Sequence, residues 1–121
     1  MALVLVVEDE SYVQTFIENA LKVSGHQVVL TGSAREAFFL CQEKAFDLII
    51  TDIVMPEMDG FELISALHES NSQLPILAIS GAFEDALKIA ERLGTAGTLK
   101  KPFGPDDLLA MVDKILGKQP G

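Results

Sequence analysis

The sequence predicts an α/β fold, in which helices pack on both faces of a parallel sheet. Five short apolar runs alternate along the chain with five amphipathic patterns of helical period. The first, third and fourth runs are apolar nearly throughout, as strands covered on both faces are. The connections between runs and helical patterns are short, which favours consecutive strand and helix pairs joined by right-handed crossovers.

The predicted strands and helices follow one another in strict alternation, as five βα units. The strand sequences are "ALVLVV" (2–7), "QVVLT" (27–31), "DLIIT" (47–51), "PILAIS" (75–80) and "GTLK" (97–100). In the last helical pattern, the spacing i, i+3, i+4, i+7 of one helix face is occupied by Leu108, Met111, Val112 and Ile115. The other four helical patterns run over residues 13–21, 34–41, 61–67 and 83–90.

Residues that begin and end helices agree with this division. Ser33 and Glu36 have the spacing of a capping box, and Pro105 follows Gly104 at the first position of the last helix. Glycines follow three of the helical patterns, as C-caps do: Gly25, Gly94 and Gly117. We interpret these residues as structural.

Length and composition indicate one domain. A chain of 121 residues with 49% hydrophobic content can bury one core, which we place in residues 1–117, followed by a flexible tail of residues 118–121. The apolar runs are far shorter than the roughly 20 residues of a membrane helix, and the N-terminus lacks the basic start of a secretion signal. We therefore expect a cytoplasmic protein without membrane contact. The net charge of −9 argues against a nucleic-acid surface, and the single cysteine, Cys41, receives no role.

The ends of the predicted strands carry the residues with reactive chemistry. In a parallel α/β sheet, sites lie at the C-terminal ends of the strands, beside the point where the strand order reverses. Four of the five strands end at such residues: Glu8, Asp9, Glu10, Asp52, Ser80, Lys100 and Lys101. Clustered carboxylates repel one another, so the group requires a cation. Mg²⁺ fits best because it binds one or two carboxylates and leaves room for phosphate oxygens.

A simpler interpretation exists for each acid taken alone. Any one of them could be a solvated loop residue, and Glu8 to Glu10 could favour the N-terminal dipole of the first helix. That interpretation does not explain why the acids end different strands at the same edge. Glu10 is the exception, because its position one residue beyond the pair places it in the first helical turn. Lys100 alternates to the face opposite Lys101, where we expect it to be solvated.

Four motifs in this order resemble the receiver domains of two-component response regulators. They are "VVEDE" with Glu8 and Asp9, "TDIVMPEMDG" with Asp52, "ISGA" with Ser80 and "LKKPF" with Lys101. The resemblance covers residues 2 to about 117. It implies a CheY-like, flavodoxin-like three-layer sandwich whose five-stranded parallel sheet has the order 2-1-3-4-5.

The resemblance implies a phosphorylation-dependent switch, which catalyses only its own phosphorylation and dephosphorylation. Asp52 would be the phosphoacceptor, a carboxylate that attacks phosphorus. Mg²⁺ would be bound directly by Asp9, Asp52 and the backbone carbonyl of Val54, whereas Glu8 would act mainly through metal-bound water.

The resemblance also assigns the phosphoryl oxygens. Lys101 would pair with one of them and the Ser80 hydroxyl with another, and the Lys101–Pro102 bond would be cis and aim the ammonium inward. Val54 and Ala82 occupy positions that tune access of the hydrolytic water, and because both are apolar we expect slow loss of the phosphate.

The partners implied are a sensor histidine kinase or histidine phosphotransfer protein as donor and a downstream protein as effector. A surface near Tyr12, Val13 and Phe16 is one candidate for docking a phosphotransfer protein. The fourth helix, fifth strand and fifth helix form the other candidate surface. Thr98 departs from the family pattern, which has an aromatic residue at this position that responds to phosphorylation.

Other classes of function can be compared on the same residues. A phosphatase with an aspartate nucleophile needs a second Asp two residues later, where this chain has Val54. A nucleotide-binding module needs a glycine-rich motif after the first strand, and "VVEDESYV" contains no glycine. A receiver-like docking adaptor that never takes phosphate would be expected to lack Asp9, Asp52 or Lys101, and all three are present.

Overall fold

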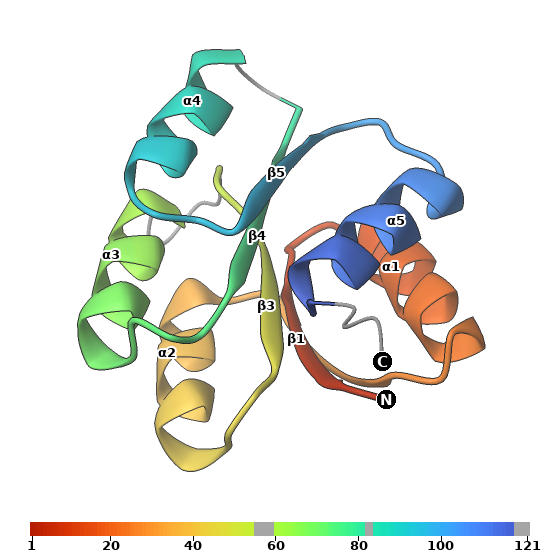
Figure 1. Cartoon of the computed structure of the whole chain (residues 1–121), viewed down its shortest axis with the longest axis horizontal. Coiled ribbons are helices and arrows are strands. Elements are labelled where there is room, and N and C mark those ends of the chain that lie inside the picture. Colours follow the sequence, from red (N-terminus) through yellow and green to blue (C-terminus); the bar gives the residue numbers. More distant parts are fainter. Residues whose placement is uncertain (55–59, 82–83, 118–121) are drawn as a thin grey trace.

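A five-stranded parallel sheet forms the centre of the described part of the chain (Figure 1). The computed structural model describes residues 1–54, 60–81 and 84–117. The strands are β1 (Leu3–Val7), β2 (Gln27–Thr31), β3 (Leu48–Asp52), β4 (Ile76–Ser80) and β5 (Gly97–Lys100). The helices are α1 (Ser11–Val23), α2 (Ala34–Glu43), α3 (Gly60–Ser70), α4 (Glu84–Arg92) and α5 (Pro105–Ile115).

The strand order is β2-β1-β3-β4-β5, which confirms the order that the resemblance implied. Helices α1 and α5 cover one face of the sheet, and α2, α3 and α4 cover the other (Figure 1). The switch in strand order lies between β1 and β3, where Val7 pairs with Thr51. The C-terminal ends of these two neighbouring strands therefore bring Glu8 and Asp52 to the same edge.

The boundaries of three strands differ from the predicted ones by one residue. Strand β1 begins at Leu3 rather than at residue 2, and β4 begins at Ile76, directly after Pro75. Strand β3 runs over residues 48–52 rather than 47–51, because Asp52 pairs with Ile79 of β4. Asp52 is therefore the last residue of the strand and is held by the ladder of the sheet.

Two apolar clusters form the core, one on each face of the sheet. Successive residues of a strand point to opposite faces, so Val4 and Val6 of β1 belong to one cluster while Leu5 and Val7 belong to the other. Strands β3 and β4 are buried at every position, which explains why their sequences are apolar without alternation. This double coverage holds the strand ends in fixed positions.

The predicted helix ends are confirmed where the structure describes them. The Ser33 hydroxyl accepts a hydrogen bond from the Glu36 N–H at 3.1 Å, and α5 begins at Pro105. The glycines after α1, α4 and α5 have positive φ angles: Gly25 (88°), Gly94 (94°) and Gly117 (68°). The Lys101–Pro102 peptide bond is cis, as expected.

Gly60, the first residue of α3, contacts the end of β3 closely. Its N–H donates to the Ile53 carbonyl at 2.8 Å, and a Cβ at this position would lie 2.5 Å from the Ile53 Cα. Only glycine permits this approach without displacement of the backbone. The start of α3 is thus tied to the residue that follows Asp52.

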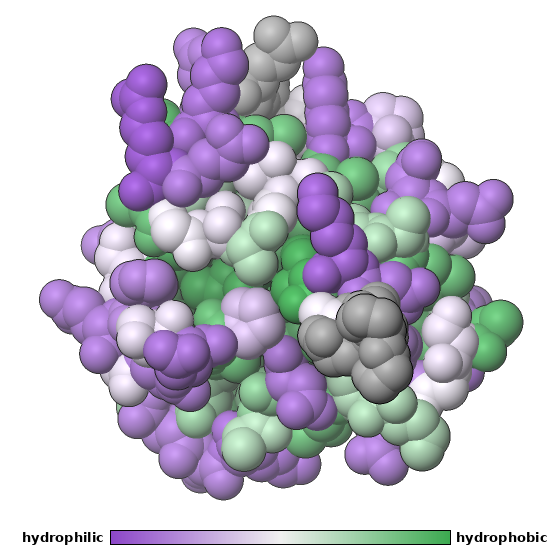
Figure 2. All heavy atoms as spheres, viewed as in Figure 1, coloured by the Kyte–Doolittle hydropathy of each residue, from purple (hydrophilic) through white to green (hydrophobic). Residues whose placement is uncertain are grey.

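The face of the molecule shown in Figure 2 is covered largely by hydrophilic side chains, with smaller hydrophobic areas between them. No described helix is both long enough and apolar enough to cross a membrane. The predicted tail, residues 118–121, lies outside the described residues.

Candidate functional site

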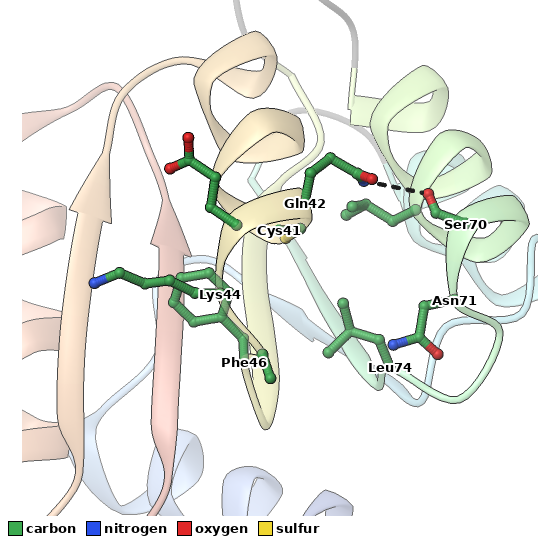
Figure 3. Close-up of a pocket in the computed structure, with 10 residues that line it drawn as sticks. Cys41, Gln42, Lys44, Phe46, Ser70, Asn71 and Leu74 are labelled. Carbon is green, nitrogen blue, oxygen red and sulfur yellow. Dashed lines mark hydrogen bonds between the residues drawn. The ribbon is translucent and has the colours of Figure 1, made fainter.

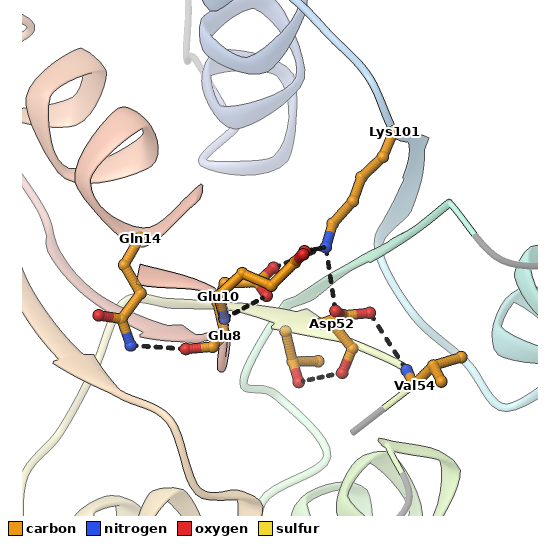
Figure 4. Close-up of polar contacts among 7 residues, drawn as sticks. Glu8, Glu10, Gln14, Asp52, Val54 and Lys101 are labelled. Atoms are coloured by element: carbon orange, nitrogen blue, oxygen red, sulfur yellow. Dashed lines mark hydrogen bonds and ion pairs between the residues drawn. The ribbon is translucent and has the colours of Figure 1, made fainter. Parts of the chain in front are cut away.

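The predicted site residues converge at the C-terminal edge of the sheet. Glu8, Asp52 and Lys101 come from the ends of β1, β3 and β5, and their side chains meet in one cluster (Figure 4). Glu8 and Asp52 are buried, with exposed fractions of 0% and 5%. Charged residues are rarely buried unless they are paired, and both of these acids are paired with Lys101.

Lys101 is the cation at the centre of this cluster. Its Nζ lies 2.8 Å from Glu8 Oε1 and 3.0 Å from Asp52 Oδ2. Burial by itself lowers the pKa of Lys101, but the contacts with Glu8 and Asp52 outweigh it and raise the pKa above its ordinary value. The ammonium therefore stays charged and neutralises part of the negative charge of two buried carboxylates.

Hydrogen bonds hold the backbone of Glu8 and one of its carboxylate oxygens. Its N–H donates to the Thr31 carbonyl at 2.9 Å, and its carbonyl accepts from the Gln14 side-chain amide. Its Oε2 accepts from the Glu10 N–H at 3.0 Å. Burial raises the pKa of Glu8, an effect that Lys101 opposes. The Glu8 side chain is thus rigidly placed, and its protonation state depends on its partner, Lys101.

Asp52 presents its two oxygens to different partners. Oδ1 accepts from the Val54 N–H at 3.1 Å, while Oδ2 faces Lys101 (Figure 4). The Val54 side chain is 47% exposed beside it. A hydrogen bond on one oxygen and an ion pair on the other orient the carboxylate toward the mouth of the site.

The acidic residues fit a hard divalent cation. Glu8, Asp9 and Asp52 each offer a ligand oxygen, and these atoms lie within 4.8 Å of one another. Glu8 Oε1 is buried and accepts no hydrogen bond from the residues that the structure describes, although Lys101 Nζ lies within ion-pair distance. Asp9 is exposed, so one ligand faces solvent. Oxygen ligands that leave part of the coordination sphere to water suit Mg²⁺.

A pocket of about 220 Å³ opens beside Asp52, and we call it the reaction pocket. Its described lining residues are Glu10, Asp52, Val54, Ser80, Gly81 and Lys101. Ser80 is 1% exposed and ends β4, so its position is fixed by the sheet. Ala82, predicted to tune water access, lies outside the described residues.

Two residues of the site have positions that the sequence did not reveal. Glu10 precedes α1 as its N-cap rather than lying in the first turn, and its side chain makes no cap hydrogen bond. Its Oε1 lies 3.4 Å from Lys101 Nζ instead. Gln14 supports the Glu8 carbonyl from the first turn of α1. The contact between Glu10 and Lys101 has no signal in local spacing, because the two residues are 91 apart in the sequence.

A second pocket, of about 270 Å³, adjoins the reaction pocket, and we call it the apolar groove. It is lined by Glu10, Tyr12, Val13, Phe16, Lys101, Pro102 and Phe103. The rings of Phe16 and Phe103 pack with centroids 6.0 Å apart. Tyr12 is 73% exposed, so this surface includes a large aromatic side chain in contact with solvent.

A third pocket, of about 290 Å³, lies between the C-terminal ends of α2 and α3 (Figure 3). Gln42 Nε2 donates to Ser70 Oγ at 3.4 Å at one side of it. Cys41 also lines this pocket, and burial raises the pKa of its thiol to about 11. None of the predicted site residues is there, so its chemistry is separate from the site at the strand ends.

Known proteins share this fold. A family model described as the response regulator receiver domain matches residues 4–113. The chain therefore belongs to the receiver domain family of the response regulators of two-component signalling. Proteins of this family act in signalling and generally bind Mg²⁺.

Individual relatives differ in length. The response regulator receiver protein CpdR of Brucella abortus is 36% identical over 117 residues, which cover 96% of this chain and 98% of CpdR. The response regulator protein FleR of Pseudomonas aeruginosa is 37% identical over 99% of this chain, which spans only 26% of FleR. The chemotaxis response regulator CheY4 of Vibrio cholerae is 31% identical, with a TM-score of 0.87 over 95% of this chain and 98% of CheY4.

Proposed function

We propose that this chain is a phosphorylation-dependent switch whose phosphoacceptor is Asp52. The observation that carries the proposal is the position of Lys101 Nζ, 2.8 Å from Glu8 and 3.0 Å from Asp52, at the edge of the reaction pocket. A carboxylate beside a fixed ammonium suits attack on a phosphoryl group, whose oxygens need positive charge. Membership of the receiver family supports the same chemistry.

Asp52 would attack phosphorus in a single displacement. A bond forms between an Asp52 carboxylate oxygen and phosphorus, and the bond from phosphorus to the donor's histidine nitrogen breaks, with its electron pair leaving on that nitrogen. The product is an aspartyl phosphate. Lys101 would move from the carboxylates to a phosphoryl oxygen, and the Ser80 hydroxyl would donate to another.

We further propose that Glu8, Asp9 and Asp52 hold Mg²⁺, together with the Val54 carbonyl. When bound, the ion would neutralise negative charge on the transferred group. Lys101 would supply the remaining positive charge. In the described part of the chain the cluster otherwise carries more carboxylates than ammonium groups, which supports a cation requirement.

The proposed donor is a phosphohistidine on a sensor kinase or phosphotransfer protein, docked at the apolar groove. Tyr12, Val13, Phe16 and Phe103 offer aromatic and aliphatic contacts next to the reaction pocket. Such contacts would place a histidine on a helix near Asp52. We also propose that the chain and its donor are both cytoplasmic.

The proposed output is a change of affinity for a downstream protein partner. With Thr98 in β5 where the family has an aromatic residue, the switch would depend on Ser80 and the connection after β4. A docking adaptor that never takes phosphate is the second candidate, and the presence of Asp9, Asp52 and Lys101 in one cluster disfavours it.

The test is incubation with acetyl phosphate, with and without Mg²⁺, followed by intact-mass measurement. We expect the wild type to gain the mass of one phosphoryl group only with Mg²⁺, and Asp52→Asn to gain none. Asp113→Asn removes the same charge on α5, away from the site, and should behave as the wild type. Phosphorylation that persists in Asp52→Asn would refute the assignment.

A further inference from the structure

Glu10 occupies the boundary between the reaction pocket and the apolar groove. Of the residues that line these two pockets, Glu10 and Lys101 are common to both. The Glu10 side chain is 49% exposed, and its Oε1 lies 3.4 Å from Lys101 Nζ. An anion that approaches Asp52 from solvent therefore meets a carboxylate at the edge of the pocket.

Backbone hydrogen bonds fix the position of Glu10, while its side chain does not cap the helix. The Glu10 N–H donates to Glu8 Oε2 at 3.0 Å, and its carbonyl accepts from the N–H groups of Val13 and Gln14 at 3.1 and 3.0 Å. An Asp at this position usually accepts a hydrogen bond from the first turn of the helix, whereas the Glu10 side chain makes no cap hydrogen bond. Its carboxylate is directed to Lys101 instead (Figure 4).

Three carboxylates thus share the Lys101 ammonium. Glu8 and Asp52 are buried and closer to Nζ, whereas Glu10 is the outer and more exposed of the three. A phosphoryl oxygen that pairs with Lys101 must compete with these acids. Glu10 is the competitor that faces the incoming donor.

We propose that Glu10 determines phosphodonor specificity, by disfavouring small free anionic donors relative to a phosphohistidine on a protein. The proposal rests on the proposed function of Asp52. A small anion has few contacts to offset repulsion by Glu10, whereas a protein donor gains apolar contacts at Tyr12, Phe16 and Phe103. The charge of Glu10 at the edge of the pocket then disfavours a donor that makes few other contacts more than a donor that makes many.

The magnitude follows from Coulomb's law for exposed charges. Two unit charges 4 Å apart in water interact by about 1 kcal/mol, which corresponds to about a fivefold change in rate. The interaction is screened by salt, with a Debye length of about 10 Å at 0.1 M and about 3 Å at 1 M. The specific signature of the proposal is therefore a salt-dependent effect on small donors.

The experiment compares the wild type with Glu10→Gln, with Mg²⁺ present, and measures the phosphorylation rate by acetyl phosphate at low and high salt. We expect Glu10→Gln to react about fivefold faster at 0.1 M salt and at nearly the wild-type rate at 1 M. Glu43→Gln is the matched control, because Glu43 is an exposed acid at the end of α2, next to the third pocket. Its rate should equal that of the wild type.

The second arm uses a phosphorylated histidine phosphotransfer domain as a protein donor. We expect Glu10→Gln to change this rate by less than about twofold, because repulsion by one screened rim charge is a minor part of a docked interaction. Thermal unfolding of each variant checks that it is folded.

The outcomes separate the two proposals. A Glu10→Gln rate equal to that of the wild type or Glu43→Gln would overturn the inference on Glu10 alone. So would an acceleration that is unaffected by salt or equally large with the protein donor. If the wild type takes no phosphate from either donor, the proposed function fails and the inference fails with it.

Discussion

Replacing Lys101 by Met should destabilise the protein strongly, because two buried carboxylates would lose their shared cation. Glu8 is fully buried and Asp52 nearly so, and both contact Lys101 Nζ within 3.0 Å. Methionine preserves most of the volume of the lysine stem. The expected loss is therefore electrostatic rather than a consequence of a cavity.

The magnitude can be worked from the burial of the three groups. Removing one partner of a buried ion pair costs about 3–5 kcal/mol. The Lys101 side chain is 17% exposed, so we take the lower end, about 3 kcal/mol. For a chain of this size, about 4 °C is lost per kcal/mol, which gives a decrease in Tm of about 12 °C.

The loss should depend on pH. Burial raises the pKa of Glu8 in the folded state above its unfolded value. A carboxyl with a raised pKa stabilises the fold fully below its unfolded pKa, and this contribution is lost as pH rises through the folded pKa. Without Lys101 the effect of Glu8 is larger, so the difference between wild type and variant should shrink toward pH 5 and grow toward pH 8.

The assay is thermal unfolding in EDTA at pH 5 and pH 8. Lys88→Met is the matched control, since Lys88 is exposed on α4, and it should change Tm little. Adding Glu8→Gln to Lys101→Met should recover part of the loss, because one uncompensated charge is removed. If Lys101→Met is no less stable than Lys88→Met at pH 8, then Lys101 does not neutralise the buried acids.

Three further predictions concern other features. Gly60→Ala should lower the free energy of unfolding by about 2 kcal/mol in urea titrations, because its Cβ would meet the Ile53 backbone at 2.5 Å. Gly32→Ala, with nothing nearer to its Cβ than 3.6 Å, should be almost neutral, and equal losses would contradict this reasoning. With a pKa of about 11, only about one Cys41 thiol in a thousand is ionised at pH 8. Iodoacetamide should therefore react with Cys41 about a hundredfold more slowly than with a free cysteine, and the rate should increase as pH rises through that pKa. Reaction at the free-thiol rate would refute the raised pKa. Asp9→Asn should weaken Mg²⁺ binding about tenfold or more in calorimetric titrations, because it removes one of the two carboxylates proposed to bind the ion directly. Unchanged affinity would exclude Asp9 as a ligand.

The sequence predicted the elements of the fold well, because the apolar runs are short and clearly separated. Strand boundaries shifted by one residue where pairing rather than composition decides, as at Asp52, which pairs with Ile79. The strand order came from the resemblance to the family. Periodicity alone cannot give the strand order, because a strand that is buried on both faces is apolar throughout, whichever strands it pairs with.

At the site, the sequence predicted which residues meet but not how their side chains divide the contacts. Glu8, Asp52 and Lys101 converge because each follows or ends a parallel strand. The direction of Glu10 could not be predicted, since it depends on a lysine that is distant in sequence. The roles of Asp52, Ser80 and the Val54 carbonyl in phosphoryl transfer stay predictions until the phosphorylation experiments are done.

Strand β5 has no fully buried residue and is an edge strand that pairs with β4 in the described sheet, yet the residue that follows it, Lys101, provides the ammonium of the site. Asp52, by contrast, ends a strand that is buried at every position. Opening of an edge strand costs less free energy than unfolding of the core. A brief fraying of β5 would therefore withdraw Lys101 while the strand that ends at Asp52 stays paired, at the electrostatic cost of leaving Glu8 and Asp52 without their shared cation.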